Sequence, residues 1–335
     1  MHSIQNKRLL FCNGLKVLRK QQMCVGTHGW FTVNLLCEMN KFQKYVHMIQ
    51  QDFPAFRVSS IKKVGEGDNS KAFLVNENYI FRFPKRKDVK QQVRREISVL
   101  PKIRSALDLQ IPDFEFISPE LHYVGYKKIA GVVLTNKIFQ CLKKNEQHFL
   151  EKTIAEFLYQ LHSFSVEALQ NCGLETMNLF DEYAENFENA KKLIFSEISK
   201  NKREIISRLF TEYLSDENNF TYAPTLVHND FSKDHILYDS VNKEIAGIID
   251  FGDIAFGDPD YDFLYLFDEF GEDFLEKILE YYQSGNRKQL VKKLYFFSLA
   301  NKIQIVLTSL KINDEDDKKK AYEDLDEWFR KFKSY

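Results

Sequence analysis

Apolar and polar positions follow different patterns in the front and rear parts of the chain, and the front part has mainly strand patterns. Short segments rich in Val, Ile, Phe and Tyr are typical of strands there. One longer segment, 89–103, instead places its apolar residues on a single helical face. The predicted elements are, in order, a helix over about 42–49, strands at 58–64, 71–75 and 79–83, the helix at 89–103, and strands between Pro112 and Pro119 and at 121–128.

The rear part, from about residue 145 onward, has mainly helical periodicity. A long, charged, amphipathic helical stretch is predicted over 187–214, and the last helix carries an apolar stripe through Leu325 and Phe329. Two short strands, at 225–228 and 245–249, interrupt the helices. The pattern therefore predicts an α+β fold with a small, β-rich N-terminal lobe and a larger, mostly helical C-terminal lobe.

Charge and cysteine content narrow the class of protein. With 47 Lys and Arg against 48 Asp and Glu, the net charge of -1 argues against a protein that coats nucleic acid or an anionic membrane. The five scattered cysteines have no CxxC spacing, which disfavours disulfide frameworks and zinc modules and indicates a reducing compartment. No apolar run approaches the roughly 20 residues that span a bilayer, and no signal-peptide pattern is present. We expect a cytoplasmic monomer that binds neither membranes nor nucleic acid.

Two polar blocks that follow or end apolar strands carry the strongest chemical signal. The first runs from His228 to His235 and contains Asp230, and the second contains Asp250 within Ile-Asp-Phe-Gly-Asp. Asp and His in turns are commonly only caps or turn residues. Two carboxylates in this order and spacing suit a different task, in which one accepts a proton from a hydroxyl and the other holds a divalent cation.

These blocks resemble the catalytic loop and the metal-binding D-F-G loop of the protein-kinase-like fold. In that resemblance Asp230 matches the catalytic Asp, Asp250 matches the metal-binding Asp, and His228 is a scaffold residue. His235 stands where the kinase pattern has Asn. A histidine ring nitrogen can ligate a metal, although Mg²⁺ prefers oxygen ligands.

A basic and glycine-containing region upstream matches the phosphate-binding side of the kinase pattern. Gly65, Gly67 and Ser70 lie between two predicted strands, where backbone N–H groups would cover nucleotide phosphates, although a plain turn is the simpler interpretation. Kinases place a Lys on the next strand. Here Arg82 is the positional match and Lys85 lies just past the strand, so both are candidates for phosphate contact.

The expected partner of that cation is Glu96, on the predicted helix 89–103. Without the motifs downstream, Glu96 would be interpreted as an ordinary solvated helix charge. The segment 82–95 carries seven Lys and Arg residues and a single acidic residue, Asp88. That basic charge suits a nucleotide-phosphate side.

Longer strings give the chain a family resemblance. They are GEGDNSKAFLVN, YIFRFPK, VGYKKIAG, LVHNDFSKDHIL and GIIDFGDIAFGDPDYDFLYL. From about residue 40 to the C-terminus the chain resembles the aminoglycoside phosphotransferases, particularly the subfamily that acts at the 2'' hydroxyl. His235 supports that subfamily, because kinases of other regiospecificity usually keep Asn there. The resemblance implies a two-lobed protein-kinase-like fold with the nucleotide between the lobes. It also implies transfer of the γ-phosphoryl group of GTP or ATP, with Mg²⁺, to an aminoglycoside, and hence antibiotic resistance.

Acidic residues gather near the second block. The 27 residues 250–276 contain ten Asp and Glu and no Lys or Arg. Asp258 before Pro259 is predicted to cap a helix, and the resemblance makes Asp262 a buried brace of the catalytic loop. A solvated acidic face is the simple interpretation of the rest, whereas an acidic rim would attract a polycation such as an aminoglycoside. The residues predicted to bind substrate are Asp230, Asp234, Asp253, Asp268, Glu269 and Glu272.

The segment after the strand at 121–128 is expected to contact the nucleotide base. Tyr126, Lys127 and Ile129 are the residues predicted to do so. Tyr126 matches the family's gatekeeper position, where a Tyr accompanies GTP preference in the 2'' subfamily and a Phe admits ATP as well. The phenol adds bulk and a polar group at the back of the base pocket. A simple amphipathic strand residue is the alternative interpretation.

The sequence thus predicts three regions. Residues 1–38 are an N-terminal extension of undefined role and a candidate for disorder, 39–125 the nucleotide-binding lobe, and 126–335 the catalytic and aminoglycoside-binding lobe. Three other functions stay open: a kinase for a small cation such as choline or ethanolamine, an inactive kinase-like binding module, and a metal hydrolase. Retention of Asp230 and Asp250 argues against the inactive module, and the β-rich front part is unexplained by a hydrolase.

Overall fold

The structure, a computed structural model of the chain, describes residues 41–67, 69–282, 287–312 and 314–332. The predicted extension 1–38 lies outside the described residues. The described residues form two compact units, an N-terminal unit (41–134 and 234–252) and a C-terminal unit (135–233 and 253–332). The predicted α+β class, with a β-rich front part and a mostly helical rear part, is confirmed. The lobe boundary at residues 125 and 126 stays a prediction.

A five-stranded antiparallel sheet is the centre of the N-terminal unit, with neighbouring strands in the order β1-β2-β3-β5-β4. A tight turn joins the second and third strands: Asn76 and Glu77 have φ of 50° and 60°, and the Asn78 amide donates to the Val75 carbonyl. The sequence located all five strands, with small differences at their ends. The strands are β1 (Ile61–Glu66), β2 (Ser70–Val75), β3 (Tyr79–Pro84), β4 (Phe114–Ile117) and β5 (Val124–Lys127).

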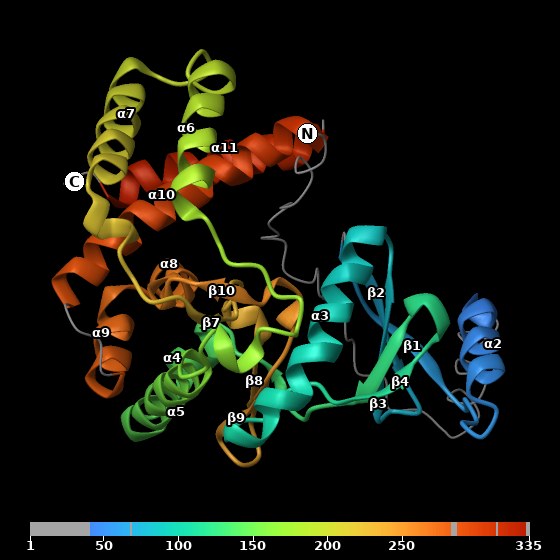
Figure 1. Cartoon of the computed structure of the whole chain (residues 1–335). Helices are drawn as coiled ribbons and strands as arrows, with labels where there is room; N and C mark the ends of the chain where they lie inside the picture. Colours follow the sequence, from blue (N-terminus) through green and yellow to red (C-terminus); the bar gives the residue numbers. More distant parts are fainter. Residues whose placement is uncertain (1–40, 68, 283–286, 313, 333–335) are drawn as a thin grey trace. The chain divides into compact units, whose positions relative to one another are not determined.

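Two helices cover the two faces of this sheet, α2 (Gln43–Asp52) and α3 (Lys87–Ile103) (Figure 1). On the α2 face, Phe81 is buried in a core that includes helix residues and several aromatic rings. On the α3 face, Val93 packs with Val124. Because successive side chains of a strand face opposite sides, the residue after Phe81 points toward α3, and this placement builds one half of the candidate site.

A smaller sheet in the same unit holds the second polar block, with strands in the order β6-β8-β9. Gly247 in the last strand lies against the backbone of Gln110, where a Cβ would collide with the Gln110 carbonyl. The close approach explains why glycine stands three residues before Asp250. The strands are β6 (Val132–Val133), β8 (Ile236–Asp239) and β9 (Glu244–Ile248).

The C-terminal unit is built around the long helix α10, which packs against α6, α7, α8 and α11 (Figure 1). Aromatic rings fill its core; Tyr213 and Phe296, for example, stack with centroids 3.7 Å apart. A short antiparallel pair, β7 with β10, leads into residues 228–235, the predicted catalytic segment. The elements are α4 (Asn136–Cys141), α5 (Lys144–His162), α6 (Leu179–Leu193), α7 (Lys200–Ser215), β7 (Thr225–Val227), β10 (Ala255–Gly257), α8 (Leu264–Phe270), α9 (Glu272–Tyr281), α10 (Arg287–Ile312) and α11 (Glu315–Lys331).

The helical stretch predicted over 187–214 is not one helix, because the chain breaks there into α6 and α7. Ser199 ends the connection: its backbone is extended and its hydroxyl accepts the Lys202 amide, which caps the start of α7. A serine with this role begins a new helix. Periodicity alone did not show the break, since the apolar spacing on both sides is helical.

Candidate active site

The segment after β7 is buried and held by a carboxylate from a distant part of the sequence. His228, Asn229 and Asp230 are all less than one-tenth exposed. The carboxylate of Asp262 accepts the backbone N–H of His228 at 2.8 Å and that of Asn229 at 2.7 Å. Asn229 has φ of 65°, in the left-handed region that asparagine adopts more readily than most residues. The brace predicted for Asp262 is therefore present.

Two further residues, His162 and Tyr282, extend this brace. The Nε2 of His162 lies 3.0 Å from Asp262 Oδ2, and its Nδ1 lies 2.8 Å from the Tyr282 hydroxyl. All three side chains are less than one-tenth exposed. Buried polar atoms that are satisfied in this way keep a loop in one conformation. The sequence showed neither residue, because a single His at the end of α5 carries no spacing signal.

The next part of the segment is tied to α8. Glu269 accepts the backbone N–H of Lys233 at 2.8 Å and its ammonium group at 2.5 Å. The backbone carbonyl of Glu269 in turn accepts the side-chain amide of Asn136 at 2.5 Å. The Glu269 side chain thus binds both the backbone and the side chain of Lys233, and the Glu269 backbone carbonyl binds Asn136.

The N-terminal unit places Arg82 and Glu96 in a two-pronged ion pair. The two guanidinium nitrogens donate to the two carboxylate oxygens of Glu96 at 3.1 and 2.6 Å. Glu96 is fully buried on α3, and the Arg82 side chain is 12% exposed. Such planar pairing is specific to arginine.

Asp250 faces the same guanidinium. Its Oδ1 lies 3.5 Å from Arg82 Nη1, its Oδ2 lies 3.6 Å from His235 Nε2, and its side chain is 53% exposed. Asp250 has φ of 65°, which turns the chain sharply after β9. The structure thus brings together, within one unit, four residues that were predicted from the sequence: Arg82, Glu96, Asp250 and His235.

Burial and charge act in opposite directions on the cation of this cluster. Burial alone would lower the pKa of Arg82, but the carboxylates of Glu96 and Asp250 outweigh burial and raise that pKa. Burial also raises the pKa of the Tyr126 hydroxyl to about 12; Arg82 opposes this effect, and Asp250 and Glu96 add to it. The guanidinium therefore stays charged and the phenol stays neutral at physiological pH.

Lys85 has a different partner from Arg82. Its ammonium donates to the Gly67 carbonyl at 2.7 Å and lies 3.2 Å from Glu66. Lys63 and Lys85 together lower the pKa of Glu66 to about 2. The Gly67 amide donates to the Ser70 carbonyl at 3.2 Å, which closes the turn between β1 and β2. Lys85 therefore holds the glycine-containing turn, and Arg82 alone of the two candidates pairs with Glu96.

The predicted base-contact residues surround the end of β5. Tyr126 is 5% exposed, and its ring packs edge-on against Phe114 at 5.7 Å. Ile129 is buried, whereas Lys127 is exposed. Gly125 lies against Phe81, and a Cβ there would come within 2.8 Å of its ring. The strand can therefore keep its close packing on the sheet only with glycine at this position.

Comparison with known proteins decides the family. The model of a phosphotransferase enzyme family matches residues 60–296, which is most of the chain. The chain belongs to the phosphotransferase enzyme family. The resemblance to that family predicted from the sequence is confirmed.

Solved structures of relatives agree with this phosphotransferase assignment. The GDP and kanamycin complex of APH(2'')-IIIa is 29% identical, with 86% of this chain and 99% of that chain covered and a TM-score of 0.82. The streptomycin–ATP ternary complex of APH(2'')-IIa is 27% identical, with 84% and 95% covered and a TM-score of 0.69. The protein-kinase-like fold is therefore confirmed, and the phosphotransferase is an enzyme of the kinase type.

A curated relative is more distant. The Bacillus subtilis (strain 168) protein named "Uncharacterized protein YcbJ" is 25% identical over 251 residues, which cover 71% of this chain and 79% of that protein. This relative adds no substrate to the comparison.

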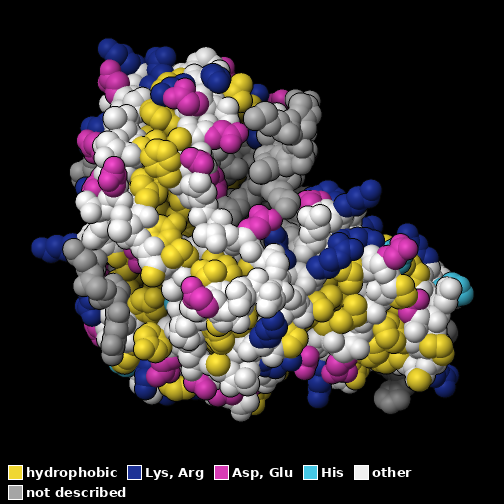
Figure 2. All heavy atoms as spheres, viewed as in Figure 1, with side chains coloured by type: hydrophobic (Ala, Val, Ile, Leu, Met, Phe, Trp, Pro, Cys, Tyr) yellow, Lys and Arg dark blue, Asp and Glu magenta, His cyan; other side chains and the backbone are white. Residues whose placement is uncertain are grey.

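The acidic residues predicted to bind substrate differ in their surroundings within the phosphotransferase. Asp268 pairs with Lys302 at 3.0 Å and with the Ser298 hydroxyl at 2.5 Å. Glu269 holds Lys233, and Glu272 accepts the Tyr295 hydroxyl at 3.0 Å. In Figure 2, Asp and Glu on the visible face of the C-terminal unit are interspersed with basic and apolar side chains. Their contact with a substrate stays a prediction.

The donors for a metal are few. Among the described residues, no group of three or more His, Cys, Asp and Glu is arranged to hold a metal ion. Asp250 and His235 are nevertheless close to each other, and Asp250 is half exposed. Mg²⁺ commonly uses one or two protein ligands together with phosphate oxygens and water, so this pair fits Mg²⁺ only together with a bound nucleotide.

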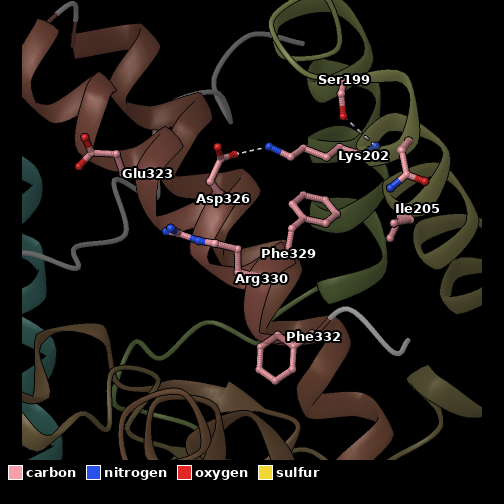
Figure 3. A pocket seen from close by; sticks show the side chains of 9 residues that line it. Ser199, Lys202, Ile205, Glu323, Asp326, Phe329, Arg330 and Phe332 are labelled. Carbon is pink, nitrogen blue, oxygen red and sulfur yellow. Dashed lines mark hydrogen bonds and ion pairs between the residues drawn. The ribbon is translucent and has the colours of Figure 1, made fainter.

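A cavity of about 500 Å³ lies between α7 and α11 (Figure 3). Lys202 and Asp326 face each other across it and pair at 2.5 Å, beside the ring of Phe329. None of the predicted site residues lines this cavity. Over the residues that the structure describes, no helix has both the length and the apolar character needed to cross a membrane.

Proposed function

We propose that the phosphotransferase moves the γ-phosphoryl group of GTP, or of ATP, to a hydroxyl of an aminoglycoside, with the 2'' hydroxyl as the expected position. The observation that carries the proposal is the cluster of Arg82, Glu96, Asp250 and His235. It combines a guanidinium held ready for phosphate with a half-exposed carboxylate beside a second metal-ligand candidate. Phosphoryl transfer depends on this combination of positioning and charge stabilisation.

The nucleotide is held on the basic side of the N-terminal unit. Glu96 orients the guanidinium of Arg82, whose charge then faces the α- and β-phosphates. Gly65, Gly67 and Ser70 form the turn that covers the phosphates, and Lys85 keeps that turn closed. Tyr126, Lys127 and Ile129 contact the base.

Asp250 and His235 are the residues that would hold Mg²⁺. When bound, Mg²⁺ supplies neutralisation of the charge that develops on the phosphoryl oxygens. The sharp turn at Asp250 directs its carboxylate to the same side as Arg82 and His235, and its exposed fraction leaves room for phosphate oxygens and water.

Asp230 acts on the acceptor. Its carboxylate orients the substrate hydroxyl and accepts its proton as the oxygen attacks phosphorus. Asp262 makes this possible indirectly, since it fixes the backbone immediately before Asp230. A positioned base needs such a fixed loop, because a small displacement of the reacting groups lowers the rate strongly.

The substrate is a cation. The solved relatives were crystallised with kanamycin and with streptomycin, and this chain has ten acidic residues between 250 and 276. The residues expected to contact the drug are Asp230, Asp234, Asp253, Asp268, Glu269 and Glu272. Phosphorylation adds negative charge to a drug that binds RNA through its positive charge, and the expected biological result is antibiotic resistance.

One experiment tests the function. The purified protein is incubated with Mg²⁺ and either GTP or ATP. Each reaction also contains one acceptor: kanamycin, gentamicin, streptomycin, choline or ethanolamine. Mass spectrometry is expected to show one added phosphoryl group on an aminoglycoside, and ³¹P–¹H NMR to locate it at the 2'' oxygen. Phosphorylation of choline or ethanolamine alone would replace the proposal with a small-cation kinase. The absence of any phosphorylated product would refute it.

A further inference from the structure

The ion pair between Lys233 and Glu269 joins the catalytic segment to a helix that was expected to bind substrate amines. The Lys233 ammonium lies 2.5 Å from Glu269 Oε1, and the two side chains are 28% and 17% exposed. Both groups are therefore accessible at their edges yet shielded enough for the pair to persist. The same carboxylate also accepts the Lys233 backbone N–H at 2.8 Å.

The pair lies close to the proposed base. Lys233 follows Asp230 by three residues, which limits the separation of their Cα atoms to about 10 Å. Glu269 contacts the Lys233 backbone directly. An aminoglycoside is larger than this distance, so we expect one with a hydroxyl at Asp230 to bring a neighbouring group near Glu269.

A substrate amine at that point meets a carboxylate that already holds an ammonium group. To pair with Glu269, the substrate ammonium must either displace the Lys233 ammonium or bind beside it, where the two positive charges repel each other. A substrate with a hydroxyl at the same position meets no such repulsion. Like charges that are brought together in this way discriminate against one partner without any new attraction to the other.

We propose that Lys233 is a specificity-determining residue, which makes the enzyme favour aminoglycosides with a hydroxyl over those with an amine near Glu269. The inference rests on the proposed function. Asp268 differs from Glu269, because Lys302 and Ser298 bind it from α10 and its side chain is only 11% exposed. The cation that pairs with Asp268 therefore comes from α10, whereas the cation that pairs with Glu269 comes from the segment that follows Asp230.

The test uses kanamycin A and kanamycin B, which differ by one hydroxyl exchanged for an amine. Affinities for both are measured by calorimetry, and kcat/KM by a coupled assay, for the full chain and for Lys233→Gln, Lys233→Arg and the double variant Lys233→Gln/Glu269→Gln. Lys191→Gln removes an ammonium from an exposed pair with Glu188 on α6 and is the matched control. Thermal unfolding verifies that each variant is folded.

Lys233→Gln is expected to shift the preference toward kanamycin B by about fivefold, the size of a partly screened charge pair. Lys233→Arg and Lys191→Gln are expected to keep the original preference, and the double variant to lose the shift because it also lacks the Glu269 carboxylate. An unchanged preference in a folded, active Lys233→Gln protein would overturn the inference and leave the proposed function intact. If neither drug binds any of the proteins, the proposed function fails, and the inference fails with it.

Discussion

Two carboxylates of the candidate site have opposite surroundings in the two units. In the N-terminal unit, Asp250 is 53% exposed and faces the side chains of Arg82 and His235. In the C-terminal unit, Asp262 is 1% exposed and accepts two backbone N–H groups and the ring of His162. The first can exchange its partners for a ligand, whereas the second would leave buried amides unpaired if it moved. The two carboxylates therefore differ in their surroundings and not in residue type, and only Asp250 has the exposure that its proposed role in ligand binding requires.

The largest expected effect is on the rate of phosphoryl transfer, after substitution of one proposed functional aspartate in each unit. Asp230→Asn is expected to lower the rate of phosphoryl transfer by about 10²–10⁴-fold, because the variant cannot accept the substrate proton. Asp250→Ala is expected to abolish nucleotide use that depends on Mg²⁺. Initial rates and unfolding temperatures are measured together. Near-normal turnover of a folded Asp230→Asn protein would remove Asp230 from the mechanism.

A buried charge network in the C-terminal unit gives the next effect. The ammonium of Lys293 lies 2.5 Å from Asp258 and 2.5 Å from Asp260, and Lys293 and Asp258 are nearly inaccessible. Lys293→Met leaves the two carboxylates without their cation, and we expect a loss of about 3–5 kcal/mol in the free energy of unfolding at pH 7. Lys191→Met on an exposed face is the control, with almost no change.

The same network predicts a pH dependence. Burial raises the pKa of Asp258 to about 6; Asp260 adds to this effect and Lys293 opposes it. A carboxyl with a raised pKa in the folded state is protonated more readily there, so its contribution to stability is present at low pH and lost as pH rises through about 6. Lys293→Met should therefore recover part of its lost stability at pH 5. Urea unfolding of both proteins at pH 5 and pH 7 measures this, and a greater loss at pH 5 would contradict it.

Asp262 and Asp250 are expected to contribute differently to the free energy of unfolding. Asp262→Ala is expected to lower the free energy of unfolding by about 3 kcal/mol, since two buried amides and a buried histidine lose their acceptor. Asp250→Ala, at a half-exposed site, should change stability far less. Chemical unfolding of both variants under the same conditions decides the matter, and equal losses would show that exposure does not separate the two roles.

Substitutions of Arg82 and Lys85 test whether the two cations of the proposed nucleotide side have different roles. Arg82→Gln is expected to raise the KM for the nucleotide by about tenfold, the effect of losing one well-positioned charged contact. Lys85→Gln should raise it less, because Lys85 holds only the turn at Gly67. Steady-state kinetics with varied GTP gives both values. A larger effect at Lys85 would reverse the assignment.

The smallest expected effect concerns the choice of nucleotide. The enzyme should have a lower KM for GTP than for ATP, and Tyr126→Phe should improve kcat/KM for ATP by about fivefold with little change for GTP. The hydroxyl that this change removes is buried, with a pKa raised to about 12. Equal efficiency with the two nucleotides in the unchanged enzyme would remove Tyr126 from this choice and leave the family assignment standing.

Much of the N-terminal unit could be predicted from the sequence. Strand alternation placed Arg82 on the face opposite to Phe81, and the structure shows the ion pair with Glu96 that this implies. The helix break at Ser199 could not be predicted from periodicity, because a cap depends on one hydroxyl and not on a repeat. His162 and Tyr282 gave no signal at all, since each is a single residue far from the segment that it supports.

The sequence by itself determined the class of the fold and the family, because those depend on local patterns and contiguous strings. The chemical roles of Asp230 and Asp250 stay predictions. Only the tertiary structure showed which partners the acidic residues have. Asp268 and Glu269 look alike in sequence, yet α10 supplies Lys302 to the first and the catalytic segment supplies Lys233 to the second. A charge acts through its partners and its exposure to water, and both are set by residues that the fold brings together from distant positions.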